Sequence, residues 1–209
     1  MTIHLSKGNK VVIFVILLLL IDQITKIWIK THLVIGESIP IFGDWFQILF
    51  IENRGMAFGF QFGGDIGKVL LSLFRIIFCV VLIVFLRNLI KKDTPMGVLI
   101  GGSLILIGAI GNTIDCTFYG VIFNESTYNQ VATLFPEGGG YAPLMFGRVV
   151  DMLYFPVIET TLPQWVPIWG GEEFVFFRPI FNIADSCITI GCLYILIFKH
   201  SFLSTVLKK

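Results

Sequence analysis

Four long apolar segments run along the chain, and polar or glycine-rich stretches separate them. A helix needs about 20 predominantly apolar residues to cross a hydrocarbon layer roughly 30 Å thick. Segments that meet this requirement lie near residues 11–29, 68–87, 96–115 and 180–198. The pattern therefore predicts an α-helical integral membrane protein, with one membrane domain over residues 1–209 and four spanning helices. The first span is too long for a cleaved signal segment, so we expect it to remain as an anchor.

The first long connection, about 31–67, contains a stretch with strand character. Residues from Ile39 to Ile51 are rich in β-branched and aromatic side chains, and Gly43-Asp44 is a typical turn sequence. This predicts a small sheet at the membrane surface.

The second long connection, about 116–179, holds six of the eight prolines and fourteen of the thirty aromatic residues. This composition excludes a flexible linker and predicts a folded cap at the membrane surface. Trp165 and Trp169 fit two interpretations equally well, anchoring among lipid headgroups or ordinary packing within the cap.

Composition narrows the function classes. Hydrophobic residues make up 56% of the chain and charged residues 14%, which excludes disorder. Fifteen basic against fourteen acidic residues leave a net charge of +1, so nothing in the charge favours nucleic acid as a partner. His4, His32 and His200 are scattered, and no Cys/His spacing resembles a zinc site, so we expect no metal and no cofactor.

The distribution of charge predicts the orientation. Cations dominate the N-terminus, the short connection after the second span and the C-terminus, where Asp93 is the only opposing acid; they are Lys7, Lys10, Arg87, Lys91, Lys92, Lys199, Lys208 and Lys209. The two long connections carry ten acids instead. By the positive-inside rule both termini are cytoplasmic and the long connections face outward.

Placing an ionisable side chain inside a membrane span costs roughly 2.5 to 3.5 kcal/mol of insertion free energy, so each such residue needs a structural or functional explanation. Asp22 and Lys26 are four residues apart and can pair on one helical face. This pair has a structural interpretation, as an orienting ion pair, and an equally good functional one. Arg75 is better explained as a packing partner for a carboxylate or carbonyl than as a catalytic group.

Two spans carry an Asn three residues before an Asp at their outward ends. The pairs are Asn112 with Asp115 and Asn182 with Asp185. This spacing puts amide and carboxylate on one helical face, where they suit the binding of extended backbone. Helix capping explains one such pair, but two at one depth indicate a site. Asp151 is a third candidate acid, although from the sequence alone a loop residue paired with Arg148 is the better interpretation.

These segments together resemble the lipoprotein signal peptidase family, also called signal peptidase II, an aspartic protease of the bacterial inner membrane. The segments occur in the family's order across nearly the whole chain. They are Asp22 with Lys26, Asn53-Arg54-Gly55-Met56-Ala57-Phe58-Gly59, Gly108 through Asp115, Val149-Val150-Asp151, and Phe181 through Ser186. Individually each motif is weak, but the combination is specific.

The resemblance implies a four-helix bundle with a small extracytoplasmic β-cradle and an extended periplasmic lid. It implies an enzyme that cleaves the signal peptide from diacylglyceryl-modified prolipoproteins, directly before the lipidated Cys. It also implies that the enzyme works in membrane lipid and needs no obligatory protein partner. Carried over by motif, Asp151 and Asp185 are the catalytic pair. The substrate-binding residues are Asn53, Arg54, Asn112, Asp115 and Asn182, with Asp22 and Lys26 as structural polar residues.

Two features depart from the family. Cys116 stands where the family usually has Arg, and we hypothesise that Arg148 or Arg178 supplies the missing cation. The insert around 117–179 is also longer than in compact members. Two other classes remain open, a proton-coupled transporter or channel and a non-enzymatic assembly factor. Acids near the outer boundary and the absence of internal repeats count against a transporter.

Overall fold

The computed structural model describes residues 5–54, 64–200 and 202. Three helices in this part of the chain are long and apolar enough to span a membrane. They are α1 (Lys7–His32), α2 (Gly64–Lys91) and α3 (Met96–Ile114), the last of which continues through a π-helical turn, η2 (Asp115–Tyr119), into α4 (Gly120–Ile122). A fourth apolar helix, α5 (Ile183–Phe198), has 16 residues and is shorter than a typical span.

Two helix ends differ from the expected spans. The third helical segment does not end at 115 but runs on to Ile122, because η2 carries the chain past Asp115. The fourth begins at Ile183 rather than 180, because Asn182 caps the helix and residues 180–181 belong to a strand. Asn182 therefore lies outside the helix, not on its face.

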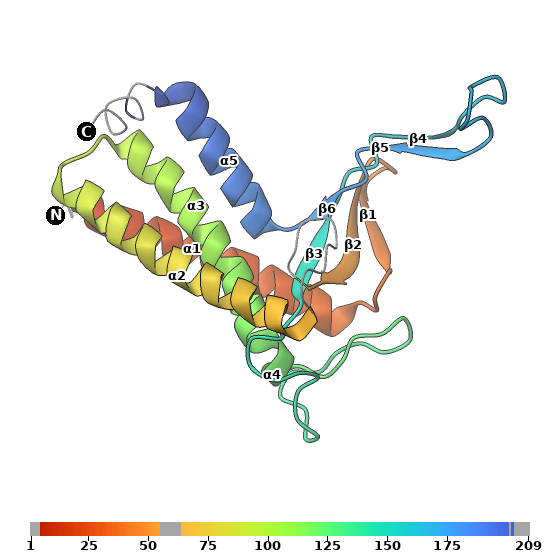
Figure 1. Ribbon diagram of the computed structural model, residues 1–209, viewed down its shortest axis with the longest axis horizontal. Helices are drawn as coiled ribbons and strands as arrows, with labels where there is room; N and C mark the ends of the chain where they lie inside the picture. Colours follow the sequence, from red (N-terminus) through yellow and green to blue (C-terminus); the bar gives the residue numbers. More distant parts are fainter. Residues whose placement is uncertain (1–4, 55–63, 201, 203–209) are drawn as a thin grey trace.

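Helix α3 packs against α1, α2 and α5 and holds the helical layer together (Figure 1). Its glycines allow α5 to approach closely. A Cβ at Gly108 would lie 2.2 Å from the backbone oxygen of Ala184, and one at Gly111 would lie 2.6 Å from an Asp22 carboxylate oxygen. These glycines thus bring the start of α5 against α3 and α1.

A four-stranded antiparallel sheet lies at one end of the helices, in the order β1-β2-β3-β6 (Figure 1). The strands are β1 (Ser38–Phe42), β2 (Phe46–Asn53), β3 (Val149–Tyr154) and β6 (Ile180–Phe181). The expected hairpin around Gly43 is confirmed, and Gly43 adopts a φ of +51° in its turn. Because β3 pairs with β2 on one side and β6 on the other, Asp151 sits inside the sheet.

The sheet packs on the end of α1 and on α4 through a hydrophobic core. Phe50, Phe123, Val150 and Met152 are fully buried there. The core holds β2 and β3 against the helices, so the polar residues on these strands have defined positions.

The rest of the second long connection forms a separate hairpin of β4 (Ile158–Thr161) and β5 (Glu173–Phe176). It projects away from the helices beyond the sheet (Figure 1). Trp165 and Trp169 lie in its tip and are 80% and 57% exposed. Packing within a cap therefore does not explain these two residues.

Candidate active site

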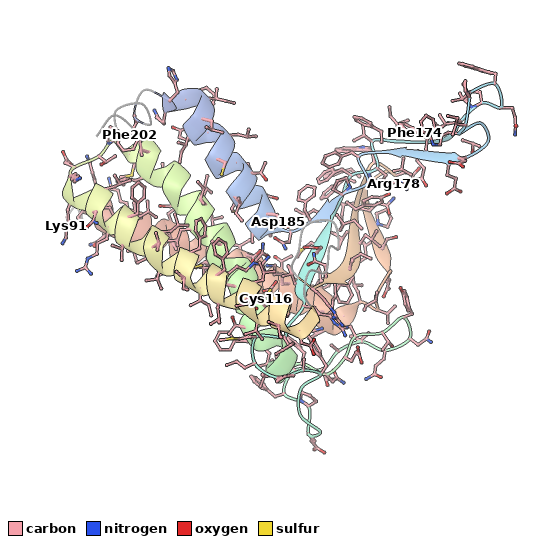
Figure 2. The ribbon with its side chains drawn as sticks, viewed as in Figure 1. Lys91, Cys116, Phe174, Arg178, Asp185 and Phe202 are labelled. Atoms are coloured by element: carbon pink, nitrogen blue, oxygen red, sulfur yellow. The ribbon has the colours of Figure 1, made fainter. Side chains whose placement is uncertain are left out.

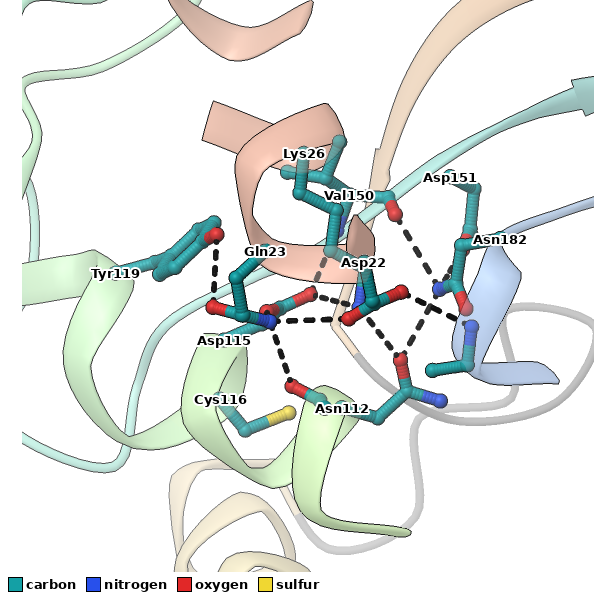
Figure 3. A network of polar contacts seen from close by, with 12 residues as sticks. Asp22, Gln23, Lys26, Asn112, Asp115, Cys116, Tyr119, Val150, Asp151 and Asn182 are labelled. Carbon is teal, nitrogen blue, oxygen red and sulfur yellow. Dashed lines mark hydrogen bonds and ion pairs between the residues drawn. The ribbon is translucent and has the colours of Figure 1, made fainter. Parts of the chain in front are cut away.

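A fully buried lysine joins the first and third helices. The Lys26 Nζ lies 3.0 Å from Asp22 Oδ2 and 2.8 Å from Asp115 Oδ2, and none of the three side chains is exposed. It also donates a hydrogen bond of 3.1 Å to Asn112 Oδ1 (Figure 3). The sequence-predicted pair of Asp22 and Lys26 exists, but it includes a second carboxylate from α3.

Gln23 belongs to the same network and was not singled out from the sequence. Its Nε2 donates to Asp22 Oδ2 at 3.0 Å and to Asp115 Oδ1 at 3.0 Å. Tyr119 Oη in turn donates to Gln23 Oε1 at 3.2 Å. A polar residue next to Asp22 within an apolar span was the available signal.

Asp22 also positions the start of α5. Its Oδ1 accepts a hydrogen bond of 3.0 Å from the backbone N–H of Ala184. Free N–H groups at a helix N-terminus attract anions, so the carboxylate stabilises this end of α5. The helix that carries Asp185 is thereby tied to α1.

Two asparagines connect Asp151 with Asp185. Asn182 Nδ2 donates to Asp151 Oδ1 at 2.8 Å and to Asn112 Oδ1 at 3.0 Å. Asn112 Nδ2 donates to Asp185 Oδ1 at 2.7 Å. The two acids, from β3 and α5, are thus joined through a chain of two amides. Figure 3 shows the part of this chain from Asp151 through Asn182 to Asn112.

The Asn182 side chain also caps the N-terminus of α5. Its Oδ1 accepts from the backbone N–H of Asp185 at 2.8 Å, while Asp185 Oδ2 accepts from the Asn182 N–H at 3.4 Å. Helix capping therefore accounts for the Asn182–Asp185 spacing. It does not account for Asn112, which lies inside α3 and bonds to both Lys26 and Asp185.

The second oxygen of Asp151 accepts a hydrogen bond from the Asn53 amide at the end of β2. Burial raises the pKa of Asp151 to about 7, and the Asp185 carboxylate adds to this rise, while the amide bonds from Asn182 and Asn53 oppose it. Pairing with Arg148 in a loop, the simpler interpretation of Asp151, is wrong. Arg148 contacts Glu52 at 3.4 Å and Glu125 at 2.8 Å instead.

A second buried lysine, also missed from the sequence, supports the strand that carries Asn53. Lys30 pairs with Glu52, the residue before Asn53, and donates to Ser126 Oγ at 2.8 Å. Its Nζ also lies 5.1 Å from the centre of the Tyr141 ring. The ion pair fixes the end of β2 against α1.

The cations near Cys116 come from α2. Arg75 Nη1 lies 2.8 Å from the Cys116 sulfur and Lys68 Nζ lies 3.6 Å from it. The hypothesis that Arg148 or Arg178 takes this position is wrong, because Arg178 donates to the Glu173 carbonyl on the β4–β5 hairpin. Arg75 does act as a packing partner, and the Cys116 thiol is one of the groups it contacts.

Lys68 also joins the two strands next to the acids. Its Nζ donates to the carbonyl of Arg54 at 2.6 Å and to the carbonyl of Gly147 at 2.7 Å. The Arg54 carbonyl comes directly after Asn53 at the end of β2, and the Gly147 carbonyl comes two residues before the start of β3. The Gly55–Gly59 part of the motif lies outside the described residues.

The arrangement contains acids and amides but no clustered metal ligands. Within residues 5–54, 64–200 and 202, no three His, Cys, Asp or Glu side chains gather as a metal site would require. Asp151 is 4% exposed and Asp185 is half-buried at the start of α5 (Figure 2). Such a pair can exchange protons with a bound water or peptide.

Comparison with known proteins identifies the family. The family model for signal peptidase (SPase) II matches residues 14–201. The chain belongs to the signal peptidase II family. The protein is accordingly a protease of a membrane-embedded family, in agreement with its apolar helices.

Individual relatives agree with this assignment. The lipoprotein signal peptidase of Porphyromonas gingivalis (strain ATCC 33277) is 52% identical over 197 residues, which cover 93% of this chain and 84% of that protein. The lipoprotein signal peptidase of Amoebophilus asiaticus (strain 5a2) is 36% identical, over 93% of this chain and 79% of that protein.

Solved structures share the fold. A bacterial membrane enzyme determined by the in meso method at 2.3 Å resolution superposes with a TM-score of 0.60 at 24% identity, covering 94% of this chain and 90% of that one. A second, at 1.9 Å resolution, has a TM-score of 0.57 at 25% identity, covering 90% of each chain.

Proposed function

We propose that the protein removes the signal peptide from diacylglyceryl-modified prolipoproteins, cleaving before the lipidated Cys, with Asp151 and Asp185 as its catalytic pair. The observation that carries the proposal is the amide chain Asp151–Asn182–Asn112–Asp185 in a chain of the signal peptidase II family. It holds two acids from distant segments at one place with no cation bound directly between them in the described residues.

The mechanism depends on unequal protonation of the pair. Two neighbouring carboxylates do not both ionise cheaply, so they share one proton. The raised pKa of Asp151, about 7, supports this state near neutral pH. In this proposal one proton serves both acids in the course of the reaction.

The ionised and the protonated carboxyl group then perform different steps of the hydrolysis. The ionised carboxylate takes a proton from a water molecule while the water oxygen attacks the scissile carbonyl carbon. The protonated acid donates to the carbonyl oxygen, and a tetrahedral diol forms. The diol collapses as the peptide C–N bond breaks: the acid that took the water proton passes it to the leaving amine nitrogen, and the other carboxylate takes a proton from one diol hydroxyl. The pair again holds one proton.

The polar neighbours have different roles in this proposal. Asn53 and Asn112 present amides at the acids and bind substrate backbone, whose polar groups are expensive to leave unpaired in a dry site. Asn182, the third predicted substrate-binding amide, is fully buried between Asp151 and Asn112 and acts by holding these two groups. Arg54 lies beside this site at the end of β2. Asp115 is fully buried on Lys26 and acts on substrate indirectly, by fixing Asn112. Asp22 and Lys26 are structural polar residues that position α5 and Asn112.

The membrane arrangement forms part of the proposal. Helices α1, α2, α3 and α5 cross the bacterial inner membrane, with both termini cytoplasmic and the sheet on the periplasmic side, as the positive-inside rule indicates. Helix α5 completes the bundle despite its 16 residues, since the capped start of α5 lies at the site near the surface. Membrane lipid is the medium, and no protein partner or cofactor takes part.

The lipid on the substrate provides the handle for recognition. Acyl chains bound along the apolar helix faces contribute about 0.8 kcal/mol per buried methylene. The test is cleavage of a prolipoprotein peptide with and without the diacylglyceryl group, by purified protein in detergent containing a chelator. We expect a metal-independent product that begins at the lipidated Cys, and poor cleavage of the unmodified peptide. Equal cleavage of both peptides, or none of either, contradicts the proposal.

A further inference from the structure

The β4–β5 hairpin is a ribbon with two chemically different faces. Paired residues of two antiparallel strands share a face, and successive residues alternate between faces. The register therefore places on one face Ile158, Thr160, Phe174 and Phe176. The other face carries Glu159, Thr161, Glu173 and Val175. One face is mainly apolar and the other carries two carboxylates.

The apolar face is uncovered. Ile158, Phe174 and Phe176 are 51%, 40% and 54% exposed, and Ile168 in the tip is 86% exposed. Two-stranded hairpins are marginally stable alone in water and gain stability when an apolar face packs against another surface. The hairpin thus has the composition of an element that is completed by something outside the chain.

A row of aromatic rings runs from the base of the hairpin to the sheet. Phe177, at the base of the hairpin, lies 6.2 Å from Phe181, which lies 5.8 Å from Phe155. Phe155 stacks on Phe46 at 4.5 Å and lies 6.5 Å from Trp45. Trp45 is itself half exposed, so the apolar surface continues from the hairpin across the outer edge of the sheet.

The location of the ribbon selects its partner. The hairpin projects from the end of the helices where the sheet and Asp185 lie (Figures 1 and 2). Its strands have four residues each and are too short to cross the hydrocarbon core, so the ribbon can meet the bilayer only at its surface. Ile66, in the first turn of α2, is also apolar and 75% exposed.

We propose that the β4–β5 hairpin lies flat on the lipid bilayer surface, with its apolar face and the tip tryptophans in the headgroup region of the leaflet next to the sheet. Tryptophan is enriched at this depth because its ring is apolar and its N–H hydrogen-bonds to polar groups. Amphipathic elements at the interface bury their apolar face by roughly 5–10 Å. The acidic face points to water, so a neutral zwitterionic headgroup suits this ribbon better than an anionic one.

Tryptophan quenching in liposomes tests the proposal without reference to peptidase activity. The protein carrying Trp28→Phe and Trp45→Phe keeps only the two hairpin tryptophans. It is reconstituted at low protein density in zwitterionic phosphatidylcholine, with or without bromine on the acyl chain near the headgroup. We expect blue-shifted emission, quenching by the brominated lipid, and a smaller iodide quenching constant than for free N-acetyltryptophanamide.

Two double variants of β5 separate the faces. Phe174→Ser with Phe176→Ser removes the apolar face and is expected to lower bromine quenching and raise iodide quenching. Glu173→Ser with Val175→Ser alters the same strand on the opposite face and is expected to leave both unchanged. Because each variant replaces two strand residues by serine, loss of hairpin structure alone affects both.

Three results would overturn the proposal. The first is iodide quenching as strong as for free tryptophan together with no bromine quenching. The second is protection that appears only after a diacylglyceryl peptide is added, which indicates substrate docking. The third is protection that disappears on dilution of protein in lipid, which indicates contact between copies of the chain.

Discussion

Two groups of buried acids lie side by side in this protein and differ in what compensates their charge. Asp22 and Asp115 share the Lys26 ammonium at 3.0 and 2.8 Å and accept further bonds from Gln23. Asp151 accepts only amide hydrogen bonds from Asn182 and Asn53 among its described contacts. The Lys26 ammonium contacts both acids of the first group, while the described contacts of Asp151 are neutral amides.

This difference separates a structural centre from a candidate reactive one. A cation in contact with buried carboxylates offsets their charge and orients the groups around it. A buried carboxylate beside another carboxylate keeps a proton to neutral pH, and proton transfer requires such a group. Asn112 links the centres, because it accepts from Lys26 and donates to Asp185.

Removing either reactive acid should have the largest effect. Asp151→Asn and Asp185→Asn, tested separately, are each expected to slow cleavage of a lipidated peptide at least about 100-fold, since general acid–base groups contribute about 10²–10⁴. Thermal unfolding should change little, because the amide keeps the shape of the side chain. Asp93→Asn, an exposed surface acid, is the control. Undiminished turnover in either test variant contradicts the assignment.

Removing the cation should instead affect stability. Lys26→Met leaves two buried carboxylates without their partner and is expected to cost about 3–5 kcal/mol of unfolding free energy. Denaturant titration in detergent measures it. Lys7→Met breaks an exposed pair with Asp93 at 2.6 Å and should cost less than about 1 kcal/mol. If the two variants lose equal stability, the structural role of Lys26 is refuted.

The pH dependence should identify the shared proton. As pH rises through about 7 the pair loses its proton, so the cleavage rate is expected to fall. The folded protein holds this proton more tightly than the unfolded chain, so this group's contribution to stability also decreases between pH 3.8 and about 7. Rate measurements across pH, with circular dichroism at each point, check both. A rate that keeps rising well above pH 7 would exclude this proton.

Removing one amide should shift the alkaline limb of the pH–rate profile, which is the pH range where the cleavage rate falls. Asn53 stabilises the charged form of Asp151, so Asn53→Ala raises its pKa further and is expected to shift the alkaline limb upward by about one to two pH units. Gln47→Ala lies on the same strand, with its amide on the Asp44 carbonyl, and should leave the limb in place. An unchanged or lowered limb in Asn53→Ala argues against the contact.

The smallest effect on stability and activity is expected at Arg148, directly before β3. Arg148 is partly exposed and pairs with Glu52 and Glu125, so Arg148→Ala should cost no more than about 1 kcal/mol of unfolding free energy. Cleavage should remain near the wild-type rate, since Arg148 touches neither acid. A loss of rate like that of Asp151→Asn would revive a direct role for this cation.

The sequence by itself predicted the features that depend on local spacing. Apolar runs of span length indicated the helices, and the turn at Gly43 indicated the first hairpin, because hydrophobic period and turn chemistry are properties of neighbouring residues. Asn112 and Asp115 were expected on one face, and both do contact Lys26.

Only the tertiary structure decided which distant groups meet. Asp151 is brought to Asn182 by the pairing of β3 with its neighbours, and Gln23 reaches Asp115 because glycines in α3 permit close packing. The cations at Cys116 came from α2, which no local pattern indicated. Such contacts join residues tens of positions apart, and their geometry depends on strand register and helix packing, which spacing along the chain does not encode.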